Sequence, residues 1–221
     1  MAITEFEMNR PYGEKIPGGL WSMPAAERNK EAILAALKKC VPSAGKVLEV
    51  ASGTGQHIVY FAAALKYLEW IPSEPDPDFR LSIRSRIERV KLSNIASPLD
   101  LDVTSRPWPV TQVDVVLCCN MVHVAPWEAA QELMKGAEEV LSDVGVLFLY
   151  GPYRRHGTHT APSNESFDRQ LRQKNSAWGV RDLESLEKLG QSIGLILDEV
   201  VEMPANNFGL IFRRHLLRIK K

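Results

Sequence analysis

Strand-like and helix-like segments alternate along most of this chain. The strand-like segments are short and rich in apolar or β-branched residues, and they cover residues 46–50, 69–73, 95–103, 113–119 and 144–151. Segments with apolar residues at helical spacing cover 25–40, 56–68, 80–92 and 127–141. Parallel neighbouring strands need crossover connections, and helices are the usual crossover. The alternation therefore predicts a doubly wound α/β fold around a mostly parallel sheet.

The end of the chain departs from this alternation. After a helix expected at 182–193, two strand-like runs at 195–203 and 208–216 are joined by Pro-Ala-Asn-Asn, which are turn-forming residues. We expect an antiparallel hairpin there, and hence a seven-stranded sheet. With 221 residues and no segment that resembles a linker, residues 1–221 are expected to form one domain.

Composition narrows the classes of partner and compartment. The 27 basic residues balance the 27 acidic ones, which argues against a nucleic-acid surface. No run reaches the roughly 18 apolar residues of a membrane span. The three cysteines have no metal-ligand spacing, so we expect no metal and a reducing compartment: the cytoplasm, with the nucleus also compatible. Cys118 and Cys119 are expected to be packing residues of a buried strand.

The stretch LEVASGTGQHI, residues 48–58, lies between the first strand and the next helix. Ligands bind open α/β sheets at such strand ends. Gly53 and Gly55 allow positive φ and close approach of the backbone to a ligand. Glu49, just before the turn, would oppose a diphosphate and favour a cationic ligand. Because no Lys-Ser/Thr pair follows the glycines, a phosphate-binding P-loop is excluded.

A second carboxylate, Glu74, ends the second strand. It lies 21 residues after Gly53, close to the spacing of about 20 residues at which an acid binds a ribose hydroxyl in dinucleotide folds. The sequence therefore predicts a nucleoside site across the first two strand ends.

Together, Glu-x-Ala-Ser-Gly-Thr-Gly after the first strand, Glu74, Asp102 and the closing hairpin resemble the class I S-adenosylmethionine-dependent methyltransferases, which have a Rossmann-like fold. The resemblance is closest to the methyltransferase-like 26 family and its bacterial relatives. It extends over nearly the whole chain through the segments 25–30, 120–127, 178–182 and 203–207. Ala51 departs from the usual acid-x-Gly-x-Gly-x-Gly loop, because it replaces the first glycine.

The resemblance implies that S-adenosylmethionine is the cofactor and S-adenosylhomocysteine the product, with no metal. It assigns cofactor binding to Glu49, Ala51, Ser52, Gly53, Gly55, Glu74, Asp102, Asn120, Arg28 and Asn29. By this resemblance, Glu74 binds the ribose and Asp102 binds the adenine amino group. Asp100 is the alternative residue for the adenine contact, and capping a turn is the alternative role of Asp102. Asn120 and His123 are the candidate catalytic residues. His123 is the expected base, with a purely structural histidine as the alternative.

Acceptor recognition is expected from parts outside the common core. These are an N-terminal arm or lid, residues 1–24, and a substrate-side insertion, residues 152–181, with a short helix at 164–174. The candidate substrate-binding residues are Trp21, Tyr153, Trp178 and Arg181, and we expect the three aromatic side chains to wall a pocket beside Asn120 and His123. Local packing of a surface subdomain is the alternative role for each.

Three functions follow from these patterns. The first is a methyltransferase that acts on a small molecule or a protein side chain. The second is a non-catalytic module that binds S-adenosylmethionine and regulates or engages a partner. An NAD-dependent oxidoreductase is the third, and it is disfavoured by the hairpin and by the absence of Gly-x-Gly-x-x-Gly spacing. The oligomeric state cannot be read from the sequence.

Overall fold

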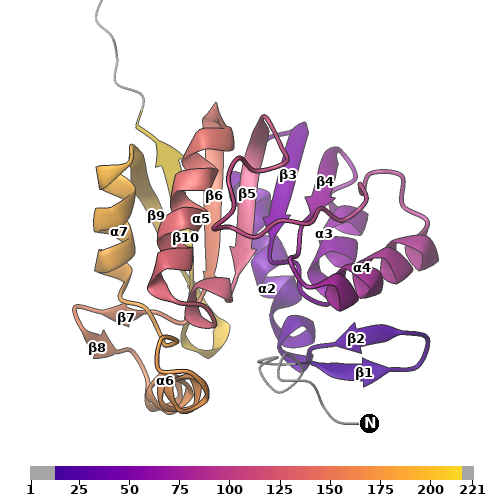
Figure 1. The fold of residues 1–221 in the computed structure, drawn as a ribbon. Coiled ribbons are helices and arrows are strands. Elements are labelled where there is room, and N and C mark those ends of the chain that lie inside the picture. The colour runs from indigo at the N-terminus through magenta and orange to yellow at the C-terminus, as the bar shows by residue number, and fades with distance from the viewer. Residues whose placement is uncertain (1–12, 216–221) are drawn as a thin grey trace, which may run out of the picture.

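A computed structural model describes residues 13–215. Its central six-stranded sheet has the order β4-β3-β5-β6-β10-β9 (Figure 1). The strands are β3 (Gly45–Val50), β4 (Leu68–Pro72), β5 (Val113–Cys119), β6 (Leu141–Gly151), β9 (Leu195–Met203) and β10 (Asn207–Arg214). The first four are parallel, whereas β10 runs antiparallel to both β6 and β9. The sheet is therefore mostly parallel with an antiparallel edge.

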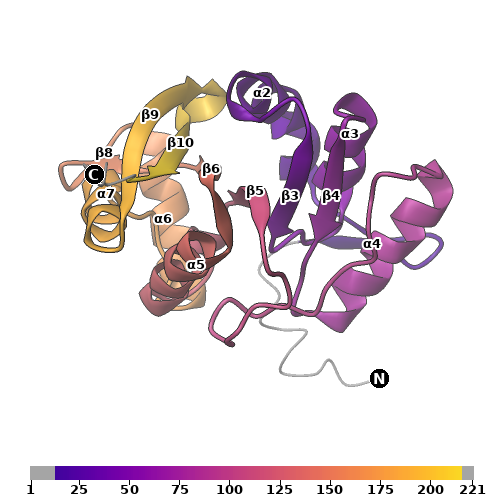
Figure 2. The ribbon, with the colours of Figure 1, turned by 90° about the horizontal axis from the view of Figure 1, so that it is seen from above.

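Helices cover both faces of this sheet (Figure 2). On one face, α2 (Pro24–Cys40) and α3 (Gln56–Ala64) bury apolar residues such as Ile33 and Phe61. On the other, α5 (Trp127–Val140) and α7 (Leu183–Ser192) bury residues such as Leu133 and Leu186. The central strands are apolar on both sides because each side faces a helical layer.

The expectation of seven strands was wrong for the described residues. Where a third strand was expected at 95–103, only Ile95 and Leu99 form isolated parallel bridges, to Trp70 and Ser73. Pro98 interrupts the segment, and proline cannot donate to a sheet ladder. The segment follows the β4 edge without becoming a regular strand.

The helix boundaries differ most from the sequence prediction at the end of α3 and the start of α4. Helix α3 ends at Ala64 instead of 68, because Leu68 already begins β4. Helix α4 (Pro77–Val90) begins earlier than expected, because Asp76 caps it by accepting hydrogen bonds from the backbone amides of Asp78 and Phe79. The N-cap residue Asp76 thus fixes how soon after Glu74 the helix begins along the chain.

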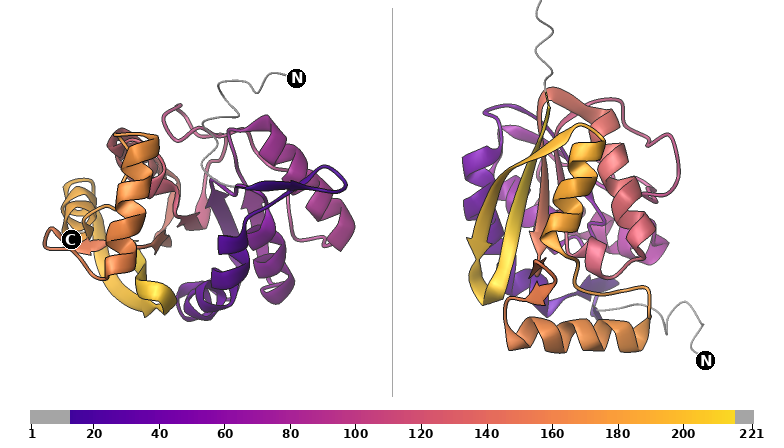
Figure 3. Two further views of the ribbon diagram at one scale, coloured as in Figure 1. Left: turned by 90° about the horizontal axis from the view of Figure 1, so that it is seen from below. Right: turned by 90° about the vertical axis from the view of Figure 1, so that its left-hand side faces the viewer.

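The carboxyl ends of β3, β4, β5 and β6 meet at one edge of the sheet, the lower edge in Figure 1. Two small additions flank it (Figure 3). One is the hairpin of β1 (Glu14–Ile16) and β2 (Leu20–Ser22). The other contains β7 (Arg154–Arg155), β8 (Thr158–His159) and α6 (Pro162–Lys174). The 3-10 turns η1 (Met121–His123) and η2 (Pro204–Asn206) follow β5 and β9.

Candidate functional site

The turn after β3 has the backbone geometry that its glycines suggest. Gly53 and Gly55 have φ of 55° and 81°, and Ala51, in place of the usual first glycine, also has a positive φ of 54°. A Cβ on Gly55 would lie 2.9 Å from the side chain of Ile83, so α4 approaches this backbone closely. The amide of Ser52 donates to the carbonyl of Ser73 at 2.8 Å and ties the turn to the end of β4.

Glu49 is buried directly before this turn. Its side chain is 2% exposed, and Oε2 has no hydrogen-bond partner among the described residues. Burial, together with a smaller effect of the negative charge of Glu74, raises the pKa of Glu49 to about 8. A buried carboxyl with an unused oxygen is costly unless a ligand supplies a donor.

Glu74, after β4, faces the same turn. Its Oε2 accepts from the Gly53 amide at 2.9 Å and its Oε1 from the Asp76 amide at 3.1 Å. Burial raises the pKa of Glu74 to about 7 in spite of these two bonds. When ionised, the two buried acids at neighbouring strand ends repel each other, and a cation with N–H or O–H donors would stabilise both ionised groups.

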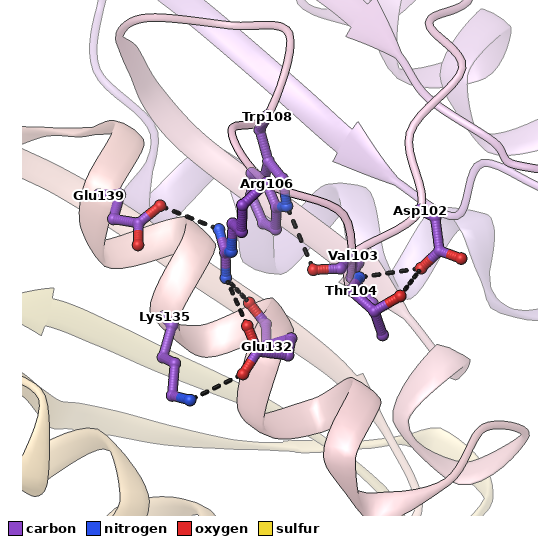
Figure 4. Close-up of polar contacts among 8 residues, drawn as sticks. All are labelled: Asp102, Val103, Thr104, Arg106, Trp108, Glu132, Lys135 and Glu139. Atoms are coloured by element: carbon purple, nitrogen blue, oxygen red, sulfur yellow. Dashed lines mark hydrogen bonds and ion pairs between the residues drawn. The ribbon is translucent and has the colours of Figure 1, made fainter.

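Asp102 lies farther along the same edge, in an exposed loop (Figure 4). Its Oδ1 accepts from the Thr104 amide at 2.9 Å and from the Thr104 hydroxyl at 2.8 Å, which is the turn-cap role. Its Oδ2 has no bond drawn to the neighbours shown. The rival Asp100 binds both terminal nitrogens of Arg80, at 3.0 and 2.9 Å.

Asn120 and His123 lie together at the end of β5. Asn120 has a φ of 63°, and its amide donates to the Tyr150 carbonyl at 2.8 Å. A Cβ on Gly151 would lie 2.3 Å from His123 Nε2 and 3.3 Å from Asn120 Oδ1. Both side chains therefore converge on the α-carbon of Gly151, at the end of β6.

The environment of His123 differs from that of an exposed base. The side chain is fully buried, and burial lowers the pKa of His123 to about 3, helped by the positive charge of Arg181. Its Nδ1 accepts from the Arg181 amide at 3.4 Å, so the neutral ring carries its proton on Nε2. Nε2 itself has no partner among residues 13–215.

The insertion places its candidate residues in different environments. Tyr153 is fully buried, packs edge-on against His123 with ring centroids 5.0 Å apart, and has an unpartnered hydroxyl within the described chain. Arg181 donates to the carbonyls of Val122, Ala125 and Ala177 at 2.6 to 2.9 Å and so fixes η1. Trp178 is partly buried.

Trp21 lies on the other flank. Its ring packs edge-on against Phe79 of α4, with centroids 5.5 Å apart, and its carbonyl accepts from Arg86 at 2.6 Å. Trp21, Tyr153 and Trp178 were expected to line one pocket. Trp21 is held against α4, whereas Tyr153 packs against His123.

Arg28 and Asn29 lie in the first turns of α2. Arg28 is exposed, and Asn29 Oδ1 is 2.7 Å from Nε2 of His57 in α3. Sequence reasoning missed Gln56, which accepts from the Met23 amide at 2.6 Å and donates to Glu27 at 2.7 Å. A polar residue at the first position of an apolar helix was the available signal.

Gly151 was also missed, although a glycine at the end of an apolar strand is visible in the sequence. No group of three or more His, Cys, Asp or Glu side chains in the described part of the chain is placed to hold a metal ion. A cavity of about 410 Å³ lies at the opposite, amino-terminal end of the strands, lined by residues such as Lys46 and Tyr67. It is remote from the acids and from His123.

Comparison with known families shows to which family the chain belongs. The model of the family described as "Protein of unknown function (DUF938)" matches residues 21–214. The chain belongs to this family. The match begins within β2 and ends with β10, so the DUF938 region includes the glycine turn, both acids and the insertion. Within residues 13–215 of this DUF938 protein, no helix is long and apolar enough to cross a membrane.

Solved structures similar to this DUF938 protein include methyltransferases. An O-methyltransferase family protein from Burkholderia thailandensis has a TM-score of 0.74 at 15% identity, covering 86% of this chain and 57% of its own. Mitomycin 7-O-methyltransferase MmcR has a TM-score of 0.73 at 13% identity, with coverages of 86% and 54%. CalO1, a calicheamicin-biosynthesis methyltransferase with S-adenosylhomocysteine bound, has a TM-score of 0.65 at 16% identity, covering 86% of this chain and 55% of its own.

The DUF938 chain thus spans little more than half the length of these proteins. At such identities the likeness shows the fold alone, which is the class I methyltransferase fold.

Proposed function

We propose that this protein is an S-adenosylmethionine-dependent methyltransferase. The observation that carries the proposal is the unpartnered Oε2 of Glu49, buried at the carboxyl end of β3 beside a turn of positive φ. Glu74 adds a second buried acid on the neighbouring strand. A ligand with positive charge and several donors satisfies both groups, and a nucleotide diphosphate does not.

The residues present fit the cofactor. S-adenosylmethionine supplies, when bound, an ammonium group, ribose hydroxyls and an electrophilic methyl group on a sulfonium. Glu49 would accept from the ammonium group. Glu74 would accept from ribose hydroxyls, since a carboxylate can take more than the two backbone bonds it has. Gly53 and Gly55 would let the backbone approach the ligand.

The remaining cofactor roles concern the rim of the site. Asp102 would accept from the adenine amino group through the oxygen that Thr104 leaves free. Asn120 and the turn residues Ala51 and Ser52 would shape the methionine end. Arg28 and Asn29, at the start of α2, would contact the cofactor from the β2 side; Asn29 also contacts His57 of α3.

The similarity of fold to S-adenosylmethionine-dependent enzymes supports the proposal, and the segments quoted above support the finer assignment to the methyltransferase-like 26 family. The acceptor is a small molecule or a protein side chain. A binding module without catalysis is the second candidate, and the observation in its favour is that His123 and Tyr153 are both fully buried.

Labelled methyl transfer separates the two. The full chain is incubated with S-adenosylmethionine carrying a radioactive methyl group and with a cell extract divided into small-molecule and protein fractions. A methyltransferase places label in one fraction and produces S-adenosylhomocysteine. Binding of S-adenosylhomocysteine by native mass spectrometry, with no label transferred to either fraction, would identify a binding module.

A further inference from the structure

The end of β6 gathers buried hydrogen-bond donors that the fold does not use. His123 Nε2 and the Tyr153 hydroxyl are fully buried and lack partners among residues 13–215. The Arg181 amide occupies Nδ1 of the ring, so Nε2 is a donor. Buried donors without acceptors are costly, which points to a ligand atom that accepts.

The same region is electropositive. The Arg181 guanidinium is bonded to three backbone carbonyls and forms no ion pair within the described residues, so its local partners are carbonyl dipoles and the Trp127 ring, whose centroid lies 5.8 Å away. The negative charges of Asp168 and Glu128 favour the charged form of Arg181 from a distance, and the positive charges of Arg172 and Arg154 disfavour it. Asp168 is in turn bound to Arg172 at 3.0 Å and to the Val180 amide at 2.7 Å.

This arrangement suits an acceptor that needs no base. Because Nε2 carries a proton, His123 cannot remove one from a hydroxyl or an amine without first changing its tautomer. An oxygen that is already ionised at neutral pH requires only donors and positive charge. A carboxylate, whose pKa is about 4, has this property.

We propose, on the basis of the methyltransferase function above, that the acceptor is a carboxylate, which Nε2–H of His123 and the Tyr153 hydroxyl bind and orient. One carboxylate oxygen attacks the methyl carbon and a new O–C bond forms. The C–S bond breaks with its electron pair left on sulfur, so the sulfonium becomes a neutral thioether. The product is a methyl ester, and no proton is released.

Access to this position requires movement, because both donors are covered. The segment that covers His123 is the end of the insertion: the Gly179 amide donates to the His123 carbonyl at 3.0 Å, and the Arg181 amide to its ring. The acceptor would therefore enter during a transient opening of residues 179–181, which closes again so that the Arg181 amide occupies Nδ1.

The first test is nitrogen NMR of the His123 ring in the full chain saturated with S-adenosylhomocysteine. We expect the proton on Nε2, and a shift of that signal on addition of sodium acetate but not of acetamide, its neutral isostere. A ring protonated on Nδ1, an equal response to both probes, or no response to either would overturn the inference. Failure of S-adenosylhomocysteine to bind would instead overturn the proposed function.

The second test uses the labelled methyl product. Methyl esters release methanol in mild alkali, whereas ethers and methylamines do not. We expect the label to become volatile, in the small-molecule or the protein fraction according to the source of the carboxylate. Label that resists alkali would contradict a carboxylate acceptor while leaving methyl transfer intact. No label in any fraction would contradict both proposals.

Variants of His123 separate a donor from a base. His123→Gln retains an N–H donor of similar reach but cannot act as a base, whereas His123→Leu retains neither property. We expect His123→Leu to lower transfer about 100-fold or more and His123→Gln to lose roughly 10-fold or less. Equal losses in both, with both variants folded by circular dichroism, would overturn the donor role. Tyr153→Phe, which keeps the ring, should lower transfer in the same direction.

Discussion

At the scale of single residues, the proposed site depends on Glu49 and Glu74, two buried carboxyl groups that form no ion pair among residues 13–215. Burial holds the pKa of both above the ordinary value for glutamate, to about 8 and about 7. Below pH 4.5 both groups are protonated in the folded and in the unfolded chain. As pH rises, the unfolded chain ionises first, so the folded state loses stability until the folded pKa is passed.

This predicts a specific pH dependence of stability without ligand. The free energy of unfolding should fall between about pH 4.5 and pH 8, by at most about 1.4 kcal/mol per pH unit for each carboxyl. Glu49→Gln, which is neutral at every pH, should flatten this fall. Urea unfolding of both proteins at pH 5, 6, 7 and 8 measures it, and parallel pH profiles would show that Glu49 is not the buried acid responsible.

At the scale of elements, the loop that carries Asp102 is held against α5 (Figure 4). Arg106 bonds to Glu132 and Glu139 of α5, and its guanidinium lies 5.0 Å from the ring centroid of Trp108. Trp108 is 4% exposed. The approach depends on Gly136, where a Cβ would lie 2.2 Å from both the Arg106 and the Trp108 side chains.

Gly136→Ala should therefore destabilise the protein even though alanine favours helices. Overpacking of a filled core costs about 1–3 kcal/mol, and alanine gains about 1 kcal/mol over glycine in helix propensity. The cost therefore exceeds the gain when it lies in the middle or upper part of its range. Lys135→Ala, at the neighbouring exposed position, is the control, with an expected change of about 0.5 kcal/mol or less. Chemical denaturation compares them. A Gly136→Ala protein as stable as the parent would mean that Trp108 is free to move away.

The β1–β2 hairpin is the element proposed as a lid. Trp21 attaches it to α4, and Gln56 attaches the following Met23 to the glycine turn. Residues 1–12 of the arm lie outside the described residues. Cofactor contacts at the turn should stabilise this attachment, so S-adenosylhomocysteine should slow amide hydrogen exchange of residues 13–30 by about 10-fold or more, equivalent to about 1.4 kcal/mol. The core strand β6 serves as the internal control. Unchanged exchange at 13–30 would leave the hairpin a fixed part of the surface.

The helices and strands could be predicted from the sequence better than the contacts between their side chains. Alternation of buried strands and amphipathic helices gave the parallel core, because each pattern depends on local periodicity. The expected strand at 95–103 failed because its pattern contains Pro98, whose effect on a sheet edge outweighs the apolar neighbours. The tautomer of His123 could not be foreseen, since it depends on an amide 58 residues away.

At the scale of the whole molecule, the insertion and the β1–β2 hairpin are added to a sheet whose fold is shared with methyltransferases of different substrates. The shared sheet cannot select an acceptor, so we propose that the additions at its carboxyl edge do so (Figure 3). In this protein the insertion supplies Tyr153 and Arg181, and the sheet supplies the two acids. In the proposed function, cofactor binding and acceptor binding are thus carried by different parts of the molecule.

Isothermal titration calorimetry of the purified full chain with S-adenosylhomocysteine and, separately, with NAD tests the central claim most directly. The buried acids of β3 and β4 favour the ammonium-bearing ligand and oppose the diphosphate. We expect binding of S-adenosylhomocysteine, weakened by about 1–3 kcal/mol in Glu49→Gln because a charged hydrogen bond is lost, and no binding of NAD. Binding of NAD with no response to S-adenosylhomocysteine would contradict the account.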